Sequence, residues 1–201
     1  MFALIDNEQI TKHISGNKGI TIGDVQYPRS IFTLWSEAER NAIGIYVITI
    51  DTTNKKDEKY YINTNVSYGV ESNKAVGSYG TATAKALADA NATDDDGVEL
   101  DPVVVIEGLK TKHKRIIKQQ ASGLLTNYDW YVIRKADAGT AVPSAITTYR
   151  AAVRTKSGQM ETAIDNAANV DALAALYEYV NTGTEENPVM ERPLGEFPEA
   201  V

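Results

Sequence analysis

The sequence predicts an α+β protein, in which a small antiparallel β region at the N-terminus is followed by a helical C-terminal module. Residues 1–88 contain short runs of β-branched or alternating apolar residues, which are typical of strands. Residues 109–183 carry apolar side chains at a helical spacing of three or four. Between these regions, residues 89–108 hold an acidic block that we interpret as a linker, and residues 184–201 form a proline-rich acidic tail.

The first fifty residues predict strands and one short helix. Apolar residues on either side of a polar turn predict a hairpin over residues 2–14, and a weaker strand is expected over residues 19–25. Ser36 is followed three residues later by Glu39, which is the pattern of a capping box, so a helix is expected over residues 37–41. Residues 45–50 give the strongest strand prediction, because every residue there is β-branched or aromatic.

The rest of the N-terminal region is predicted from alternation. Residues 59–71 alternate with a period of two, so the even-numbered side chains should face a core. Residues 81–92 are rich in alanine and predict a weak helix.

The C-terminal module is expected to contain three helices. The first, from residue 109 to 125, has an apolar stripe made by Leu109, His113, Ile116, Ile117, Gln120, Leu124 and Leu125. Pro143 suits the start of the second, in which Ile146, Val153 and Met160 lie seven residues apart. Gly158 leaves open whether this is one bent helix or two. The third is expected over residues 171–180, and the tail after it should be extended unless this chain or a neighbour holds it.

Composition excludes several kinds of chemistry. The absence of cysteine excludes disulfides, thiolate metal sites and cysteine nucleophiles, and two histidines are too few for a multi-histidine metal site. There is no glycine-rich phosphate loop and no serine nucleophile elbow, so we expect neither an enzyme nor a cofactor. The net charge of −7 argues against nucleic acid as a partner. The sequence also has no membrane-spanning apolar run and no signal peptide pattern at residue 1, so no membrane partner is expected.

Two charged segments have a functional and a structural interpretation. When Gly97 is aligned with the glycine of a calcium-binding EF-hand loop, Asp94 and Asp96 fit, but Ala92 and Val103 fail at the two ends. We therefore favour a solvated acidic loop over an irregular cation site. A basic run comprises Lys110, Lys112, Lys114, Arg115 and Lys118. It contains no aromatic residue for base stacking, so we favour the exposed face of an amphipathic helix, facing an acidic neighbour.

One segment resembles a known family. Residues 124–135, with the sequence Leu-Leu-Thr-Asn-Tyr-Asp-Trp-Tyr-Val-Ile-Arg-Lys, lead to Tyr149-Arg150-Ala-Ala-Val153-Arg154. This pattern resembles the C-terminal module of bacteriophage tail fibre assembly chaperones and related tail proteins, in which a helix ends in Asp-Trp and a second helix carries Tyr-Arg-x-x-Leu/Val-Arg. The N-terminal segment is also similar to phage tail proteins, so the resemblance covers about residues 1–50 and 110–165.

The residues of this module are expected to be structural or to form an interface: Asp129, Trp130, Tyr131, Tyr149, Arg150 and Arg154. Trp130 should anchor the corner between the helices by burying its ring, and Asp129 is placed to cap a helix or to pair with Arg134 or Arg150. Tyr149 and Val153 should pack against the face of Leu124 and Leu125.

The resemblance implies a non-enzymatic structural protein of a phage tail, baseplate or tail fibre. Such a protein would be made in the cytoplasm of the bacterial host, be part of the virion, and bind other tail proteins and copies of itself. One alternative is a tail fibre assembly chaperone. A second is a carbohydrate-binding tip that recognises a host surface glycan, which depends on the tyrosines of the strand region and the carboxylates of residues 89–101.

Overall fold

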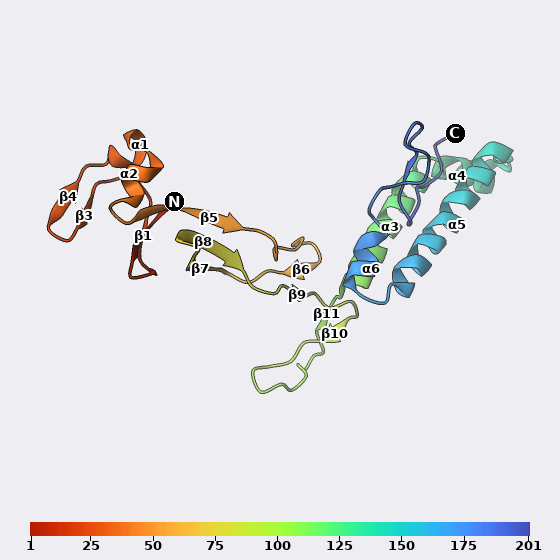
Figure 1. Cartoon of the computed structure of the whole chain (residues 1–201). Helices are drawn as coiled ribbons and strands as arrows, with labels where there is room; N and C mark the ends of the chain where they lie inside the picture. Colours follow the sequence, from red (N-terminus) through yellow and green to blue (C-terminus); the bar gives the residue numbers. More distant parts are fainter. The chain divides into compact units, whose positions relative to one another are not determined.

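The computed structural model describes residues 1–201 and divides the chain into two compact units, Met1–Thr83 and Ala84–Val201 (Figure 1). The first is mainly strands and the second mainly helices, so the prediction of an α+β protein is confirmed. The two units are described separately below. None of the helices is both long enough and apolar enough to cross a membrane.

The first unit is built around one five-stranded sheet with the strand order β2-β1-β5-β8-β7. Its elements are β1 (Phe2–Asp6), β2 (Gln9–Ile14), β3 (Ile20–Ile22), β4 (Val25–Tyr27), α1 (Ile31–Leu34), α2 (Glu37–Asn41), β5 (Ile45–Asp51), β6 (Tyr61–Ile62), β7 (Val66–Glu71) and β8 (Lys74–Tyr79). A short strand β9 (Thr83–Ala84) pairs with β6 at the end of the unit.

The sequence predicted an antiparallel β region, but the sheet is mixed. The strand β5 pairs in parallel with β8, whereas β1–β2, β1–β5 and β7–β8 are antiparallel. The tight turn between β7 and β8, where Ser72 and Asn73 both have positive φ angles, makes these two strands antiparallel neighbours. Of the two, β8 lies beside β5, and it runs in the same direction as β5.

Of two local sequence predictions in this unit, one is confirmed and the other is only partly right. The capping box is confirmed, because the Ser36 hydroxyl accepts from the Glu39 N–H at 3.3 Å while the Glu39 carboxylate accepts from the Ser36 N–H at 2.7 Å. The alternation over residues 59–71 is only partly right: Tyr60 is buried, but Ile62 is 60% exposed and Tyr68 is 39% exposed. The segment breaks into β6 and the edge strand β7, so no single face runs along it.

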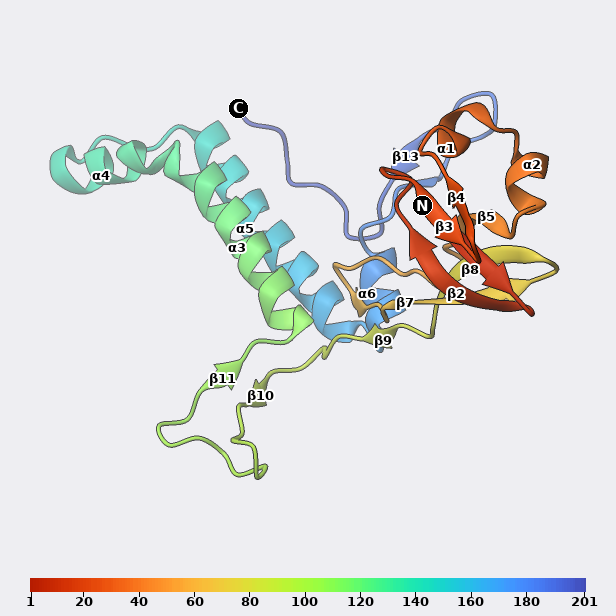
Figure 2. The same cartoon turned by 90° about the vertical axis from the view of Figure 1, so that its left-hand side faces the viewer.

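The second unit is a pair of long helices with two shorter helices and two small hairpins attached (Figure 2). Its elements are β10 (Ala90–Asn91), β11 (Val105–Ile106), α3 (Leu109–Thr126), α4 (Asp129–Ala138), α5 (Ser144–Asn166), α6 (Val170–Ala175), β12 (Val180–Asn181) and β13 (Met190–Glu191). Residues 81–92 were predicted to form a weak helix, but they are not helical. Residues 90–91 pair with residues 105–106 instead.

The core of this unit lies between α3, α5 and α6. The predicted heptad positions Ile146, Val153 and Met160 are all buried, and Gly158 lies within a single continuous α5. His113 is also buried on the core face of α3, and its ring lies 4.8 Å from the ring of Tyr177. The apolar periodicity therefore identified the core face of α5 correctly and that of α3 only in part, because Ile116 and Gln120 of the predicted stripe are exposed.

The end of the chain is not free. Helix α6 ends at Ala175 rather than near residue 180, and β12 and β13 then form a small hairpin. Leu194 is buried, and the Tyr128 hydroxyl donates to the Val201 carbonyl at 2.7 Å. The proline-rich tail is thus held by its own chain.

Candidate functional site

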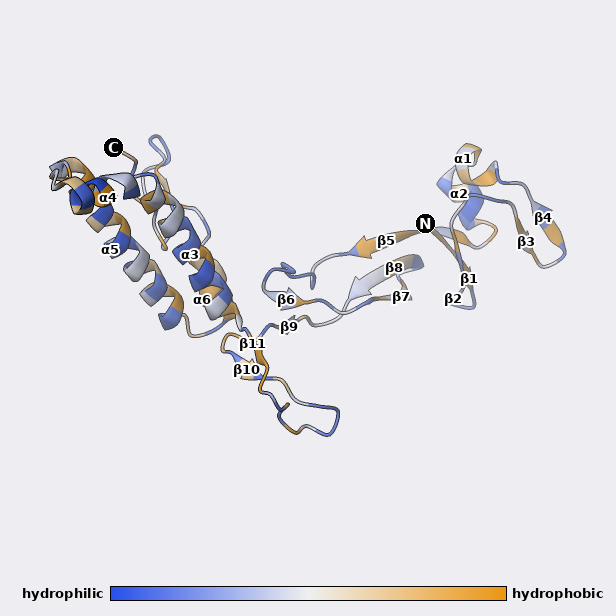
Figure 3. Ribbon diagram, turned by 180° about the vertical axis from the view of Figure 1, so that it is seen from behind, coloured by the Kyte–Doolittle hydropathy of each residue, from blue (hydrophilic) through white to orange (hydrophobic).

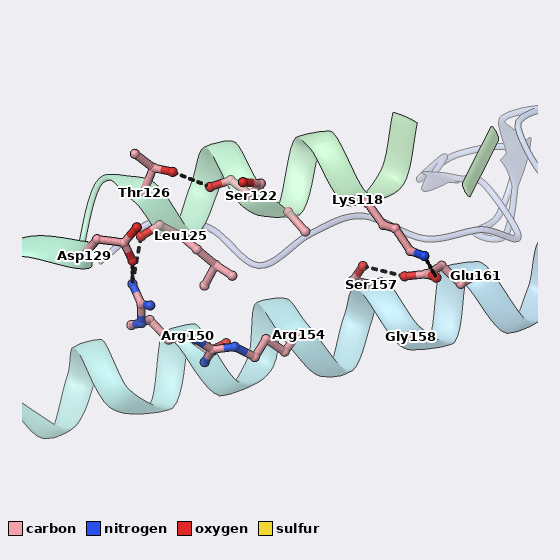
Figure 4. Close-up of a pocket in the computed structure, with 11 residues that line it drawn as sticks. Lys118, Ser122, Leu125, Thr126, Asp129, Arg150, Arg154, Ser157, Gly158 and Glu161 are labelled. Atoms are coloured by element: carbon pink, nitrogen blue, oxygen red, sulfur yellow. Dashed lines mark hydrogen bonds and ion pairs between the residues drawn. The ribbon is translucent and has the colours of Figure 1, made fainter. Parts of the chain in front are cut away.

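A polar groove lies between the second half of α3 and the middle of α5, and we call it the α3–α5 groove (Figure 4). Its volume is about 450 Å³. It is lined by Lys118, Ala121, Ser122, Leu125, Thr126, Asp129, Arg150, Arg154, Ser157, Gly158 and Glu161. Several of these residues are small, so the two helices leave space between their backbones for another group.

At one end of the groove, Arg150 links the end of α3 to the start of α4 by hydrogen bonds. Its Nη1 donates to the Leu125 carbonyl at 2.8 Å and to Asp129 Oδ1 at 2.8 Å. The Leu125 carbonyl is among the last of α3, which have no partner within the helix, and Asp129 lies in the first turn of α4. A cation at the C-terminal end of one helix and an anion at the N-terminal end of the next are both favourable for the helix dipoles. Of the two predicted partners for Asp129, the structure selects Arg150.

The predicted role of Trp130 is wrong. The Asp-Trp pair begins α4 instead of ending a helix, and Trp130 is 50% exposed. Its ring stacks on the neighbouring Tyr131, with 4.2 Å between ring centroids, and the Arg134 guanidinium lies 4.5 Å from the Trp130 centroid. Trp130, Tyr131 and Arg134 therefore form a cluster near the surface of α4.

The corner is anchored by tyrosines instead. Tyr149 is buried together with Val153 and Ala121, and Leu124 and Leu125 pack against them, as predicted. The Tyr128 ring lies 5.2 Å from the Tyr149 ring, and Phe197 of the tail joins the cluster. The Tyr149 hydroxyl is buried without a hydrogen-bond partner, and burial raises the pKa of this phenol, with a further rise from Tyr128.

At the other end of the groove, the basic face of α3 meets acids of α5. The Lys118 ammonium lies 3.3 Å from Glu161, which also accepts from the Ser157 hydroxyl at 3.1 Å. One turn away, Lys114 pairs with Asp165 at 2.8 Å, and this hydrogen bond raises the pKa of Lys114. The acidic neighbour expected for the basic run is thus α5 of the same chain.

Glu161 and Asp165 were not singled out from the sequence, although a signal exists. Each lies four residues from the other, and their partners Lys114 and Lys118 have the same spacing. In two antiparallel helices, such matched spacings bring opposite charges together along one seam.

Arg154 differs from the other basic residues of the groove. It lies one turn after Arg150, and its only hydrogen bond is a long one, 3.4 Å, to the Arg150 carbonyl. No carboxylate lies within ion-pair distance of it. Figure 4 shows its side chain lying along the groove between the paired ends. The groove can therefore accept an anionic group at this position.

The acidic segment of residues 89–108 is a hairpin, not an irregular linker, and we call it the arm. Asp89 fixes its base, because Oδ1 accepts from the Gly108 N–H at 2.8 Å and Oδ2 accepts from the Thr111 hydroxyl at 3.0 Å. These bonds, that of Gly108 first, lower the pKa of Asp89. Near the tip, Asp94 Oδ1 accepts from the N–H groups of Asp96 and Val98.

The arm exposes an unusual amount of apolar surface. The exposed aliphatic residues are Val98, Leu100, Val103, Val104, Val105 and Ile106. In Figure 3 the stretch next to β11 has the colour of hydrophobic residues. The backbone of the arm pairs with itself beyond β10 and β11, through Ala92 with Val104 and a bridge between Thr93 and Glu99. Exposed apolar side chains gathered on one hairpin are typical of a surface that binds another chain.

The first unit has a separate polar hollow of about 440 Å³. Residues of α2, β5 and the β7–β8 turn line it: Glu37, Asn41, Tyr46, Val47, Thr49, Ser72, Asn73 and Lys74. Amide, hydroxyl and charged groups beside one tyrosine ring are suited to a small polar ligand.

Comparisons with known proteins give no relative: no family model, curated protein or solved structure is significantly similar to this chain.

Proposed function

We propose that this chain is a non-enzymatic structural protein of a bacteriophage tail, baseplate or tail fibre, which acts through interfaces with copies of itself and with other tail proteins. It would be made in the cytoplasm of the bacterial host and be retained in the virion. The phage assignment is supported by the resemblance of residues 124–154 to the tail fibre-associated module.

The observation that carries the interface function is the arm. Ile106 is 58% exposed and Val98 is 61% exposed, although both are large aliphatic residues. Burying an aliphatic side chain of this size contributes about 1.5–3 kcal/mol. Six exposed aliphatic residues on one hairpin are therefore a large driving force for association.

The proposal is tested by quantitative mass spectrometry of purified particles of the phage that encodes the chain. A structural protein is present in a fixed ratio to the other tail proteins, and it remains after washing with high salt. If the chain is abundant in infected cells but absent from purified particles, the structural proposal is wrong and the tail fibre assembly chaperone is the better account.

The polar hollow of the first unit favours a second candidate function, recognition of a host surface glycan. Tyr46 offers an aromatic ring, while Asn73 and Glu37 offer groups that hydrogen-bond to sugar hydroxyls. A glycan array probed with the whole chain tests this function. Binding that is lost in Tyr46→Ala but kept in Tyr27→Ala supports it, and an array without any signal removes it.

A further inference from the structure

We propose that the α3–α5 groove receives the acidic tip of the arm of a second copy of this chain, with Arg154 as the residue that binds the incoming carboxylate. This inference deepens the proposed function, on which it rests, by naming the partner and the contact.

The groove offers one positive charge that its own chain does not neutralise. Arg150, Lys118, Lys114 and Arg115 each have a carboxylate within 3.3 Å, supplied by Asp129, Glu161, Asp165 and Glu107. Arg154 has none. Arg154 is also exposed on α5, so a carboxylate from another chain can reach it and pair with it.

The arm offers the matching groups. Residues 89–108 contain seven acidic residues and no basic one. Two of them are used at the base of the arm, where Asp89 binds the start of α3 and Glu107 pairs with Arg115 at 2.8 Å. The remaining five have no basic partner in their own chain: Asp94, Asp95, Asp96, Glu99 and Asp101. Three of these are consecutive and lie at the tip.

An arm cannot serve the groove of its own chain. It is attached at Leu109, the first residue of α3, whereas the groove is lined from Lys118 to Asp129. At a rise of 1.5 Å per residue, Ser122 is about 20 Å along the helix from the arm's base. Both Figure 1 and Figure 2 show the arm extending from that base away from the far end of α3. The acidic tip therefore meets the groove of another copy.

The consequence is a head-to-tail arrangement of copies. The arm and the groove are different surfaces on one unit, so their contact joins copies head to tail. A head-to-tail contact generates a ring when the rotation closes and a filament when it does not. Both outcomes suit a protein that is repeated in a particle.

The experiment exchanges the two charges and measures self-association of the full chain by sedimentation velocity. Arg154→Glu reverses the groove, and the double variant Asp95→Lys with Asp96→Lys reverses the tip. Each variant alone should associate at least about tenfold more weakly than the unchanged chain, because like charges then face each other. When the two variants are mixed, each arm meets a groove of opposite charge, and association should return.

Lys112→Glu is the matched control, because Lys112 is exposed on α3 and does not line the α3–α5 groove. It should associate like the unchanged chain. Arg154→Gln, which removes the charge without reversing it, should give an intermediate loss. Far-ultraviolet circular dichroism shows whether each variant is folded.

The proposal is overturned if the unchanged chain is monomeric, if Arg154→Glu associates as tightly as the control, or if the mixture of reversed variants stays apart. Its failure is separate from that of the proposed function. A chain present in fixed ratio in particles but insensitive to the charge exchange remains structural and uses another contact. If association follows the charge exchange but the chain is absent from particles, the contact between arm and groove is supported and the role in the virion is wrong.

Discussion

The ion pair between Arg150 and Asp129 should couple α4 to the long helices, and a double-mutant cycle measures that coupling. Arg150 is 8% exposed and donates from one nitrogen to both Asp129 and the Leu125 carbonyl. Hydrogen bonds to charged groups contribute about 1.5–3 kcal/mol. The Asp129 side chain is 49% exposed, so solvent screens the interaction, and we expect a coupling of about 1 kcal/mol.

The variants are Asp129→Ala, Arg150→Met and the double change. Asp129→Ala leaves a buried guanidinium with a single carbonyl partner and should cost about 2 kcal/mol, because one member of a buried pair loses its counterion. Arg150→Met keeps a long side chain but removes one of the two donors to the Leu125 carbonyl, which also accepts from the Tyr128 N–H at 3.0 Å, so it should cost about 1 kcal/mol. The double variant should cost less than the sum of the two.

Urea unfolding followed by tryptophan fluorescence gives these values. The chain has two tryptophans, and Trp35 lies in the first unit, so a Trp35→Phe background makes Trp130 the reporter of the second unit. A coupling below about 0.3 kcal/mol would be within the range of independent sites. That result would refute the claim that this pair joins α4 to the helical core.

Three further changes test other parts of the structure. Tyr149→Phe removes a buried hydroxyl that has no partner, so it should leave the free energy of unfolding unchanged or raise it by up to about 1 kcal/mol. A decrease of more than about 1 kcal/mol in the free energy of unfolding would instead show that this hydroxyl makes a hydrogen bond. Trp130→Ala should cost about 1–2 kcal/mol, well below the roughly 3–5 kcal/mol of a core tryptophan, and a cost in that upper range would restore Trp130 as a core anchor. The pKa of Asp89 is lowered by hydrogen bonds from Gly108 and Thr111, so its contribution is present above the ordinary aspartate pKa of about 3.9 and is lost as pH falls through its folded value. Asp89→Asn should therefore unfold at a lower urea concentration than the unchanged chain at about pH 6, and this difference should shrink as the pH falls below about 3.9; a difference that does not change with pH would contradict this account.

The sequence predicted those features that depend on neighbouring residues or on helical spacing. The Ser36 capping box, the strand over residues 45–50 and the buried positions Ile146, Val153 and Met160 are all confirmed. Each of them follows from side chains within one element, because a cap or an apolar stripe needs no knowledge of the partner element.

The features that the sequence did not predict are set by contacts between distant segments. The parallel pairing of β8 with β5 depends on which strand of the β7–β8 hairpin lies next to β5. The periodicity of the sequence carries no information about that. The alanine-rich segment of residues 81–92 predicted a weak helix, yet residues 90–91 pair as a strand with residues 105–106. Tertiary pairing overrides helix propensity there.

Within the candidate site, the pairing of Asp129 with Arg150 was among the predicted options, but the exposure of Trp130 was not foreseen. The Asp-Trp pair was expected to end a helix, whereas it begins α4, and this shift of one element turns the indole ring outward. Helix ends are poorly determined by propensity alone, because the last turn frays and the cap depends on neighbours.

The most direct test of the central claim is the sedimentation behaviour of the full chain with and without an apolar arm. The variant Val104→Asp with Ile106→Asp replaces two exposed aliphatic residues of the arm by carboxylates, and Val25→Asp places a carboxylate on an exposed valine of the first unit. We predict that the unchanged chain and Val25→Asp sediment as assemblies larger than the 21.9 kDa monomer, and that the arm variant sediments as a monomer. An arm variant that assembles as well as the unchanged chain would contradict the account.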